Sequence, residues 1–160
     1  ALKSYKMGNE KHKYLTDDEV ENLSIRKGTL PNKERKIMEN HARMTMKILE
    51  NLPWPRKLAN VPSIAGAHHE KLDVTGYPQN LKAEKINLQS RIMAVSDIFE
   101  ALSAPDRPYK KPMSLAQAIK VLGLMVEDNH IDKDIVELII KSGLVNEYAN
   151  RHLKKDQLDI

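Results

Sequence analysis

The spacing of apolar residues constrains the fold of this chain more than any other feature. Apolar residues recur at intervals of three and four along most of the sequence, while β-branched residues alternating with polar ones are almost absent. The first pattern places apolar side chains on one face of a helix, and the second would indicate half-buried strands. The sequence therefore predicts an all-α fold, a single-domain helical bundle over residues 16–160, preceded by a poorly patterned segment at residues 1–15.

Capping motifs and helix breakers mark the ends of the predicted helices. Thr16 and Ser114 are each followed three residues later by Glu or Gln, the pattern of a capping box. Gly, Pro and Asn between residues 73 and 87 indicate a loop. The predicted helices cover residues 16–25, 31–51, 56–72, 88–104, 114–127 and 132–143, and a short one follows towards the C-terminus.

The composition limits the class of protein. At 160 residues, the chain is long enough for one compact domain with its own core. It has no cysteine, which excludes disulfides and thiolate ligands and is typical of a reducing cytoplasm. The net charge of +4 is modest, and aromatic residues make up only 4% of the chain, so a nucleic-acid groove is not indicated. No apolar run approaches the length of a membrane span.

Residues 68–78, His-His-Glu-Lys-Leu-Asp-Val-Thr-Gly-Tyr-Pro, combine candidate metal ligands, carboxylates for acid or base chemistry, and a rigid turn. Each of these polar side chains must be solvated or given a partner. On the predicted helix, His68 lies on an apolar stripe and diverges from His69 by about 100°. That divergence favours two neighbouring ions over one shared ion. The alternative is a pair that interacts with the carbonyls and the dipole at a helix C-terminus.

Two further polar residues occupy positions where apolar side chains are expected. His41 shares a helix face with Ile37 and Met44, so it is predicted to be buried. The alternative to a role as a metal ligand is a core histidine whose ring is hydrogen-bonded to a backbone carbonyl. Asp97 lies within residues 92–102, which are apolar nearly all round, and a buried carboxylate needs a metal or a salt bridge. Together with the two adjacent histidines they form a nitrogen and oxygen ligand set that suits iron, manganese or zinc.

A proline-stiffened basic turn follows the helix that carries Asp97. Its sequence is Asp-Arg-Pro-Tyr-Lys-Lys at positions 106–111. Guanidinium and ammonium groups donate charge-assisted hydrogen bonds to phosphate oxygens, so the turn is suited to hold a phosphate near a metal centre. The alternative is a solvated basic turn without a ligand.

These motifs resemble those of the HD-GYP domains, a branch of the HD metal-dependent phosphohydrolases that degrades cyclic di-GMP and related cyclic dinucleotides. The resemblance covers nearly the whole chain. Its most specific parts are His-His-Glu at 68–70, Gly-Tyr-Pro at 76–78, Asp97, and Arg-Pro-Tyr-Lys at 107–110. The family fold is a bundle of helices, which agrees with the fold expected from the apolar spacing.

The resemblance implies a cytoplasmic signalling phosphodiesterase with a cyclic dinucleotide as substrate and iron or manganese as cofactor. The implied metal ligands are His41, His68, His69 and Asp97. The implied substrate contacts are Tyr77, Arg107 and Lys110. A diguanylate cyclase or another signalling domain is the kind of partner protein that the resemblance suggests, and nucleic acid is not expected.

Two departures from the family pattern bear on activity. The name-giving His-Asp pair should precede His41, but the chain has only His12 there, followed by Lys13. Either the pair lies upstream of this sequence, or the site is degenerate, binds no metal and serves as a module for a nucleotide or a partner. Val74 stands where the family has glycine. A β-branched residue resists positive φ, so we expect a rebuilt loop.

Overall fold

The computed structural model describes residues 4–7, 10–24, 32–104 and 112–159. The chain divides into two compact units, Ala1–His41 and Ala42–Ile160. Helix α2 (Asn32–Glu50) contains the boundary between them, with His41 as the last residue of the first unit. The boundary expected between residues 15 and 16 stays a prediction.

The first unit contains a short hairpin and a short helix. Strand β1 (Ser4–Met7) pairs antiparallel with β2 (Glu10–Lys13), within the segment for which no pattern was expected. Helix α1 (Asp17–Leu23) begins with the predicted capping box. The Thr16 amide donates to Glu19 Oε2 at 2.7 Å, and the Glu19 amide donates to Thr16 Oγ1 at 3.2 Å.

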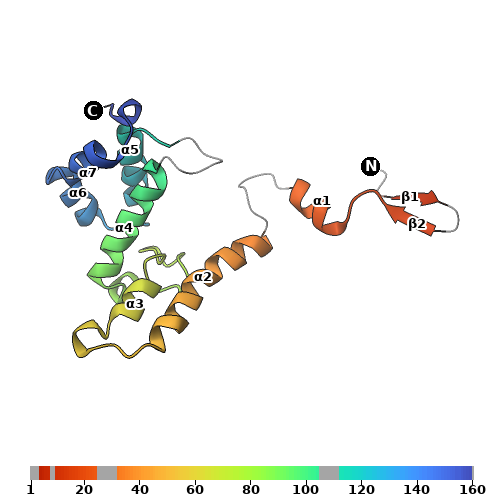
Figure 1. The fold of residues 1–160 in the computed structure, drawn as a ribbon, viewed down its shortest axis with the longest axis horizontal. Coiled ribbons are helices and arrows are strands. Elements are labelled where there is room, and N and C mark those ends of the chain that lie inside the picture. The colour runs from red at the N-terminus through yellow and green to blue at the C-terminus, as the bar shows by residue number, and fades with distance from the viewer. Residues whose placement is uncertain (1–3, 8–9, 25–31, 105–111, 160) are drawn as a thin grey trace. The chain divides into compact units, whose positions relative to one another are not determined.

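The second unit is helical, which confirms the predicted fold class (Figure 1). After the second half of α2 come α3 (Val61–Gly66), α4 (Leu88–Ser103), α5 (Leu115–Glu127), α6 (Lys133–Lys141) and α7 (Leu144–His152). Single-turn 3₁₀ helices lie between α2 and α3 (η1, Arg56–Leu58), between α3 and α4 (η2, Ala83–Lys85) and after α7 (η3, Lys155–Gln157). Helix α4 packs against α3, α5 and α6, and so links the segment that carries the adjacent histidines to the C-terminal helices.

The hydrophobic core lies among α4, α5, α6 and α7. Its centre is formed by Val95 and Phe99 of α4 together with Ala118 and Leu122 of α5. Fully burying a side chain the size of Leu122 contributes about 2 kcal/mol. The remaining core residues are Leu115, Ile131, Ile135, Val136, Val145 and Ala149. This core fixes the middle of α4 and the turn between α5 and α6, both of which border the candidate site.

The apolar stripe predicted on α2 is not buried. Ile37, Met44 and Ile48 are 72%, 48% and 60% exposed, and His41 is also exposed. Ala42, the next residue of α2, is in contrast fully buried. The expectation of a buried His41 is therefore wrong. Periodicity identifies an apolar face of a helix, but it does not specify which surface covers that face.

The helix expected over residues 56–72 is much shorter in the structure. It is split into η1 and α3, and α3 ends at Gly66. A side chain at Gly66 would lie within 2.0 Å of Met46 Cγ, so the glycine permits a close approach to α2. The Ala67 amide then bonds Ile64 O and the Glu70 amide bonds Ala67 O, which turns the chain out of the helix. His68 and His69 consequently lie in the turn after the helix.

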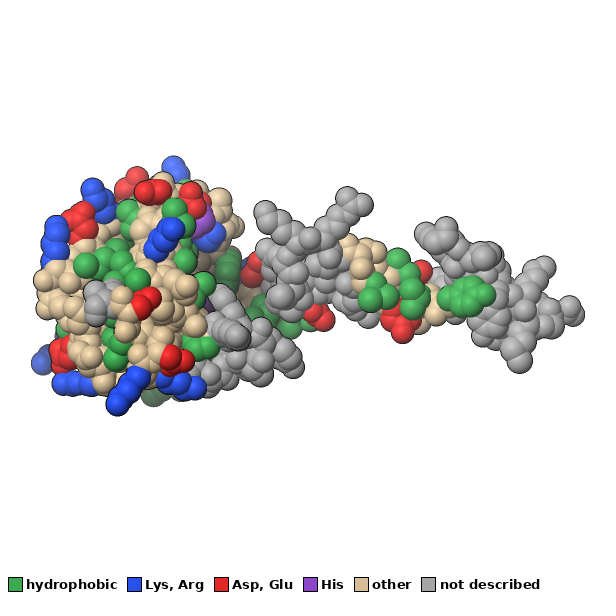
Figure 2. Space-filling model, turned by 90° about the horizontal axis from the view of Figure 1, so that it is seen from above, with side chains coloured by type: hydrophobic (Ala, Val, Ile, Leu, Met, Phe, Trp, Pro, Cys, Tyr) green, Lys and Arg blue, Asp and Glu red, His purple; other side chains and the backbone are tan. Residues whose placement is uncertain are grey.

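Charges of both signs are mixed on one face of the second unit (Figure 2). On the face in view in Figure 2, Lys and Arg side chains are interspersed with Asp and Glu. This distribution agrees with the modest net charge of the chain, and the absence of a nucleic-acid partner stays a prediction. Among the described residues, no helix combines the length and apolar character needed to cross a membrane. A cytoplasmic location stays a prediction.

Candidate metal centre

The segment between α3 and α4 is organised around one buried carboxylate. Glu70 is only 5% exposed, and its Oε1 accepts a hydrogen bond from the Gln79 amide at 2.7 Å. Its Oε2 accepts from the Leu81 amide at 2.9 Å. Both oxygens are therefore engaged by backbone donors, which satisfies a charge that would be costly if unpaired. Glu70 ties the two ends of the site loop, residues 70–81, to each other.

Gly76 lies where no side chain fits. A Cβ at this position would come within 2.3 Å of the Lys71 amide nitrogen and 2.5 Å of Glu70 Cα. Because these are backbone atoms, they cannot move aside as a flexible side chain can. The Tyr77 amide next to it donates to His69 O at 3.2 Å, and the Tyr77–Pro78 peptide bond is cis. The loop therefore folds back onto the segment that carries the two adjacent histidines.

Val74 takes the backbone conformation that glycine would take. Its φ is +69°, in the left-handed region, and its amide donates to Lys71 O at 3.1 Å. Asn80 Nδ2 donates to Gly76 O at 2.5 Å and closes the loop from the other side. Valine therefore does take positive φ here, and a loop rebuilt relative to the family stays a prediction. The surrounding hydrogen bonds hold valine in a conformation that costs an L-residue about 1–2 kcal/mol.

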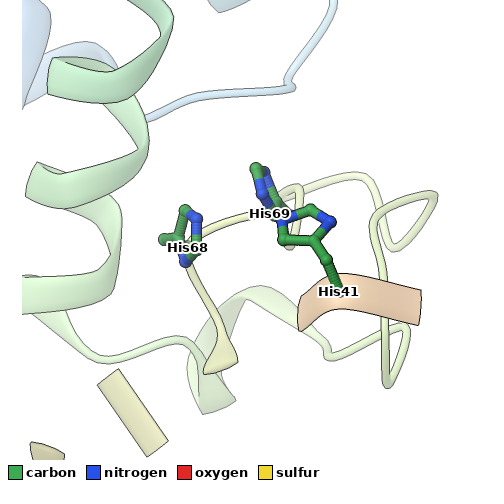
Figure 3. A group of neighbouring side chains, drawn as sticks. All are labelled: His41, His68 and His69. Carbon is green, nitrogen blue, oxygen red and sulfur yellow. The ribbon is translucent and has the colours of Figure 1, made fainter. Parts of the chain in front are cut away.

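Three histidines form a group that could hold a metal ion. His41, His68 and His69 each offer a ring nitrogen, and these three atoms lie within 4.8 Å of one another (Figure 3). His68 and His69 come from the turn after α3, and His41 comes from α2. The ring centroids of His68 and His69 are 3.9 Å apart. The predicted divergence of these two rings is wrong, because neither residue is in a helix.

The hydrogen bonds of two of these rings suit metal binding. His68 Nδ1 bonds Ala65 O at 2.6 Å, and His41 Nδ1 bonds Met38 O. A proton on Nδ1 leaves the Nε2 lone pair of each ring as the available ligand, an arrangement that is common around protein-bound metals. The same contact to Met38 O is the one expected if a backbone carbonyl alone satisfies His41. Both readings of His41 from the sequence are thus compatible with this contact.

A cavity of about 190 Å³ lies beside the two adjacent histidines. Its polar lining includes His68, His69, Tyr77, Asp97 and His130, and its apolar wall includes Ile98 and Met125. The Tyr77 ring stacks on the His69 ring with centroids 4.8 Å apart. Four of the residues expected at the site therefore border one cavity.

Asp97 lies at this cavity, but it is not buried. It is an exposed residue of α4, whose buried side carries Ala94, Val95 and Phe99. The prediction of burial is wrong, because α4 buries only one of its apolar faces. The carboxylate thus needs no compensating partner for stability, although its place beside the histidines makes it available as a ligand. Arg107 and Lys110 lie outside the described residues.

The sequence interpretation missed His130, which follows α5 and lines the cavity. Its Nε2 lies 3.3 Å from Asp73 Oδ2. Asp73 Oδ1 accepts from the Thr75 hydroxyl at 2.7 Å and from the Thr75 amide at 2.9 Å. These Thr75 hydrogen bonds, and next the neighbouring His130 and Lys71, hold the pKa of Asp73 below its usual value. The signal that was available in the sequence is Asn129, which is suited to a left-handed residue at a helix end.

Comparison with known proteins places the chain in a family. A family model described as HD domain matches residues 15–135. The 3'3'-cGAMP-specific phosphodiesterase 3 of Vibrio cholerae is 42% identical over 95 residues, which cover 59% of this chain and 20% of that protein. A cyclic di-GMP phosphodiesterase of the same species is 35% identical over 126 residues, 75% of this chain and 25% of that protein.

A third relative comes from another organism. The cyclic di-GMP phosphodiesterase of Thermotoga maritima is 36% identical over 98 residues, which cover 61% of this chain and 26% of that protein. The chain thus spans about a quarter or less of the length of the first relatives. The match of the family model covers most of the chain, and the names of the relatives agree with the motifs at residues 68–78 and 107–110. The chain belongs to the HD domain family and resembles its HD-GYP branch.

Proposed function

We propose that this chain is the catalytic domain of a metal-dependent phosphodiesterase that hydrolyses a cyclic dinucleotide. The observation that carries the proposal is the arrangement of His68, His69, Asp97 and Tyr77 around one cavity, with His41 beside the two adjacent histidines. The relatives named as cyclic di-GMP and 3'3'-cGAMP phosphodiesterases support the same substrate class.

The donor set fits a divalent transition metal. The Nδ1 contacts of His41 and His68 leave Nε2 of each ring to face an ion, and Asp97 adds an oxygen donor at the same cavity. Imidazole and carboxylate ligands without thiolate suit iron or manganese. Bound at these residues, such ions would supply a hydroxide near neutral pH and polarise the phosphodiester. We propose His41, His68, His69 and Asp97 as the ligands.

The cavity volume bears on how the substrate binds. Ligand pockets usually have about 300–1,000 Å³, and this cavity has only about 190 Å³. We infer that one phosphodiester linkage enters it while the rest of the dinucleotide lies over the neighbouring surface. The Tyr77 ring would lie beside the phosphodiester linkage that enters the cavity. We propose Arg107 and Lys110 as cationic contacts to the phosphates. Such side chains would donate charge-assisted hydrogen bonds to the phosphate oxygens.

The test is hydrolysis by the intact protein after loading with iron(II) or manganese(II), with cyclic di-GMP and 3'3'-cGAMP as separate substrates. We expect linear dinucleotide as the product and loss of turnover with a chelator. Asp97→Asn should lower metal content without lowering the melting temperature of the metal-free protein, because Asp97 is exposed. Glu127→Gln, at an exposed carboxylate on α5, is the matched control. Absence of turnover by metal-loaded protein would contradict the proposal.

A binding module is the second candidate. The observation in its favour is that no His-Asp dipeptide occurs in the 160 residues. In this case the cavity would retain an intact dinucleotide, and a signalling domain such as a diguanylate cyclase would be a suitable partner. Calorimetry on metal-poor protein distinguishes the candidates: tight binding of a dinucleotide that is recovered uncut favours the module.

A further inference from the structure

His130 is placed by the way α5 ends. Asn129 has φ +56°, and its amide donates to Val126 O at 3.0 Å. The His130 amide donates to Met125 O at 2.9 Å. These two hydrogen bonds and the left-handed residue are the elements of a Schellman motif, which satisfies the last carbonyls of a helix. The backbone of His130 is therefore fixed by local structure, independently of the site loop.

A second set of contacts braces the same turn from α4. Arg91 Nη1 donates to Asp132 Oδ2 at 2.9 Å, and Asp132 Oδ1 caps α6 by accepting from the Asp134 amide at 3.0 Å. Arg91 also donates through Nη2 to Ala83 O at 2.6 Å and through Nε to Ile86 O at 2.9 Å. The turn that carries His130 is thus connected to α4 and to the segment before it.

From this braced turn, His130 contacts the site loop twice. Its carbonyl accepts from the Leu72 amide at 3.2 Å, and its Nε2 lies 3.3 Å from Asp73 Oδ2. A neutral ring with its proton on Nε2 can donate to Asp73, so the contact does not require a charged histidine. The other oxygen of Asp73 is occupied by Thr75. Both contacts lie just before Gly76 and Tyr77 in the chain.

We propose that His130 is a positioning residue: from the turn between α5 and α6 it holds Leu72 and Asp73, and thereby sets Tyr77 at the substrate cavity. This inference rests on the proposed function for the identity of the substrate. Glu70 fixes the loop from within its own segment, whereas His130 fixes it from a segment far away in the sequence. His130 therefore determines substrate affinity through the loop, and metal binding does not depend on it.

The experiment compares His130→Ala, His130→Asn and His130→Gln in the full chain loaded with manganese(II). The amide nitrogen of Gln approximates Nε2 of histidine, whereas the shorter Asn does not reach Asp73. We expect KM for the cyclic dinucleotide to rise about tenfold in the Ala and Asn variants, with kcat and metal content nearly unchanged. The Gln variant should restore KM. Equal KM values in all three variants and the wild type would overturn the proposal.

A second measurement is independent of activity. Hydrogen exchange of the Leu72 and Tyr77 amides, which are bonded to His130 O and His69 O, reports how firmly the loop is held. Exchange should be faster in the Ala and Asn variants and unchanged in the Gln variant and in His152→Ala, a control on α7. Unchanged exchange in all variants would overturn the inference. If the wild type hydrolyses nothing while exchange responds as expected, the proposed function fails and the positioning role stands.

Discussion

The site loop, residues 70–81, is irregular but tied by hydrogen bonds, whereas helix α2 is regular but has an exposed apolar face. The loop has almost no repeating structure, yet Glu70, Asn80 and His130 tie its backbone at several points. Helix α2 is regular over Asn32–Glu50, yet Ile37 and Ile48 are exposed. The backbone of the site loop is thus held in place by hydrogen bonds between polar groups, not by regular secondary structure. Substitutions in the two regions should therefore differ greatly in their effect on stability.

The largest effect is expected at Gly76. Gly76→Ala places a Cβ within 2.3 Å of backbone atoms, so the loop must shift, and we expect a loss of about 3 kcal/mol or more in unfolding free energy. Urea denaturation measures it. Gly123→Ala is the matched control, because a Cβ at Gly123 meets nothing within 4 Å and alanine favours the helix interior by about 1 kcal/mol. Similar stability of the two variants would contradict the tight packing at Gly76.

Glu70→Ala should have the next largest effect. It leaves the amides of Gln79 and Leu81 without their acceptor, and we expect a loss of about 2–3 kcal/mol in unfolding free energy. Glu70→Gln keeps one acceptor oxygen and should lose about half as much. Chemical denaturation at pH 7 checks both variants. A fully stable Ala variant would mean that Glu70 does not organise the loop.

The contribution of Asp132 should depend on pH. Burial alone would raise the pKa of Asp132, but hydrogen bonds from Arg91 and from the Ile135 and Asp134 amides outweigh it, and the pKa is lowered. A lowered pKa means that the ionised form stabilises the fold above the unfolded pKa of about 3.9. This stability is lost as pH falls through the lower folded value.

The corresponding variant is Asp132→Asn, which keeps an acceptor for the α6 amides but loses the charge. We expect it to be about 1–2 kcal/mol less stable than the wild type at pH 7, and the difference should shrink below pH about 3.9. Melting curves between neutral and acidic pH measure this. A difference that is constant with pH would show that the charge of Asp132 contributes nothing.

Val74→Gly should be stabilising. The φ of +69° is unfavourable for valine by about 1–2 kcal/mol, and glycine removes that cost while giving the unfolded chain more freedom by about 0.5–1 kcal/mol. A net gain of about 0.5–1 kcal/mol follows. Val74→Ala, which keeps the Cβ, is the control and should gain little. A less stable glycine variant would contradict the left-handed conformation at this position.

The smallest effect is expected on the exposed face of α2. Ile48→Ser changes a side chain that is 60% exposed, so the loss in unfolding free energy should stay within about 0.5 kcal/mol. Leu122→Ala in the core should cost about 2–5 kcal/mol and serves as the reference. A loss in unfolding free energy for Ile48→Ser close to that of Leu122→Ala would show that this face of α2 is buried against another surface in solution.

Local chemistry explains which parts of the fold could be predicted from the sequence. The caps at Thr16 and Ser114 are confirmed, because a cap needs only residues a few positions apart. The prediction that His41 and Asp97 are buried was wrong, because periodicity does not identify the surface that covers a helix face. His130 was missed because its contact with Asp73 joins segments that are distant in the chain. The end of α3 at Gly66, six residues before the predicted end, was also not indicated by the apolar periodicity.

Positions 74 and 76 impose opposite demands on any residue placed there. At position 76 space excludes every side chain, whereas the backbone there does not adopt the left-handed conformation. At position 74 the backbone is left-handed, yet a valine side chain is accommodated at an exposed site. In a saturation library, position 76 should therefore accept glycine alone, whereas position 74 should accept side chains of many sizes and favour glycine, asparagine and aspartate. Two neighbouring sites in one loop would then give contrasting tolerance profiles, one set by volume and the other by torsion.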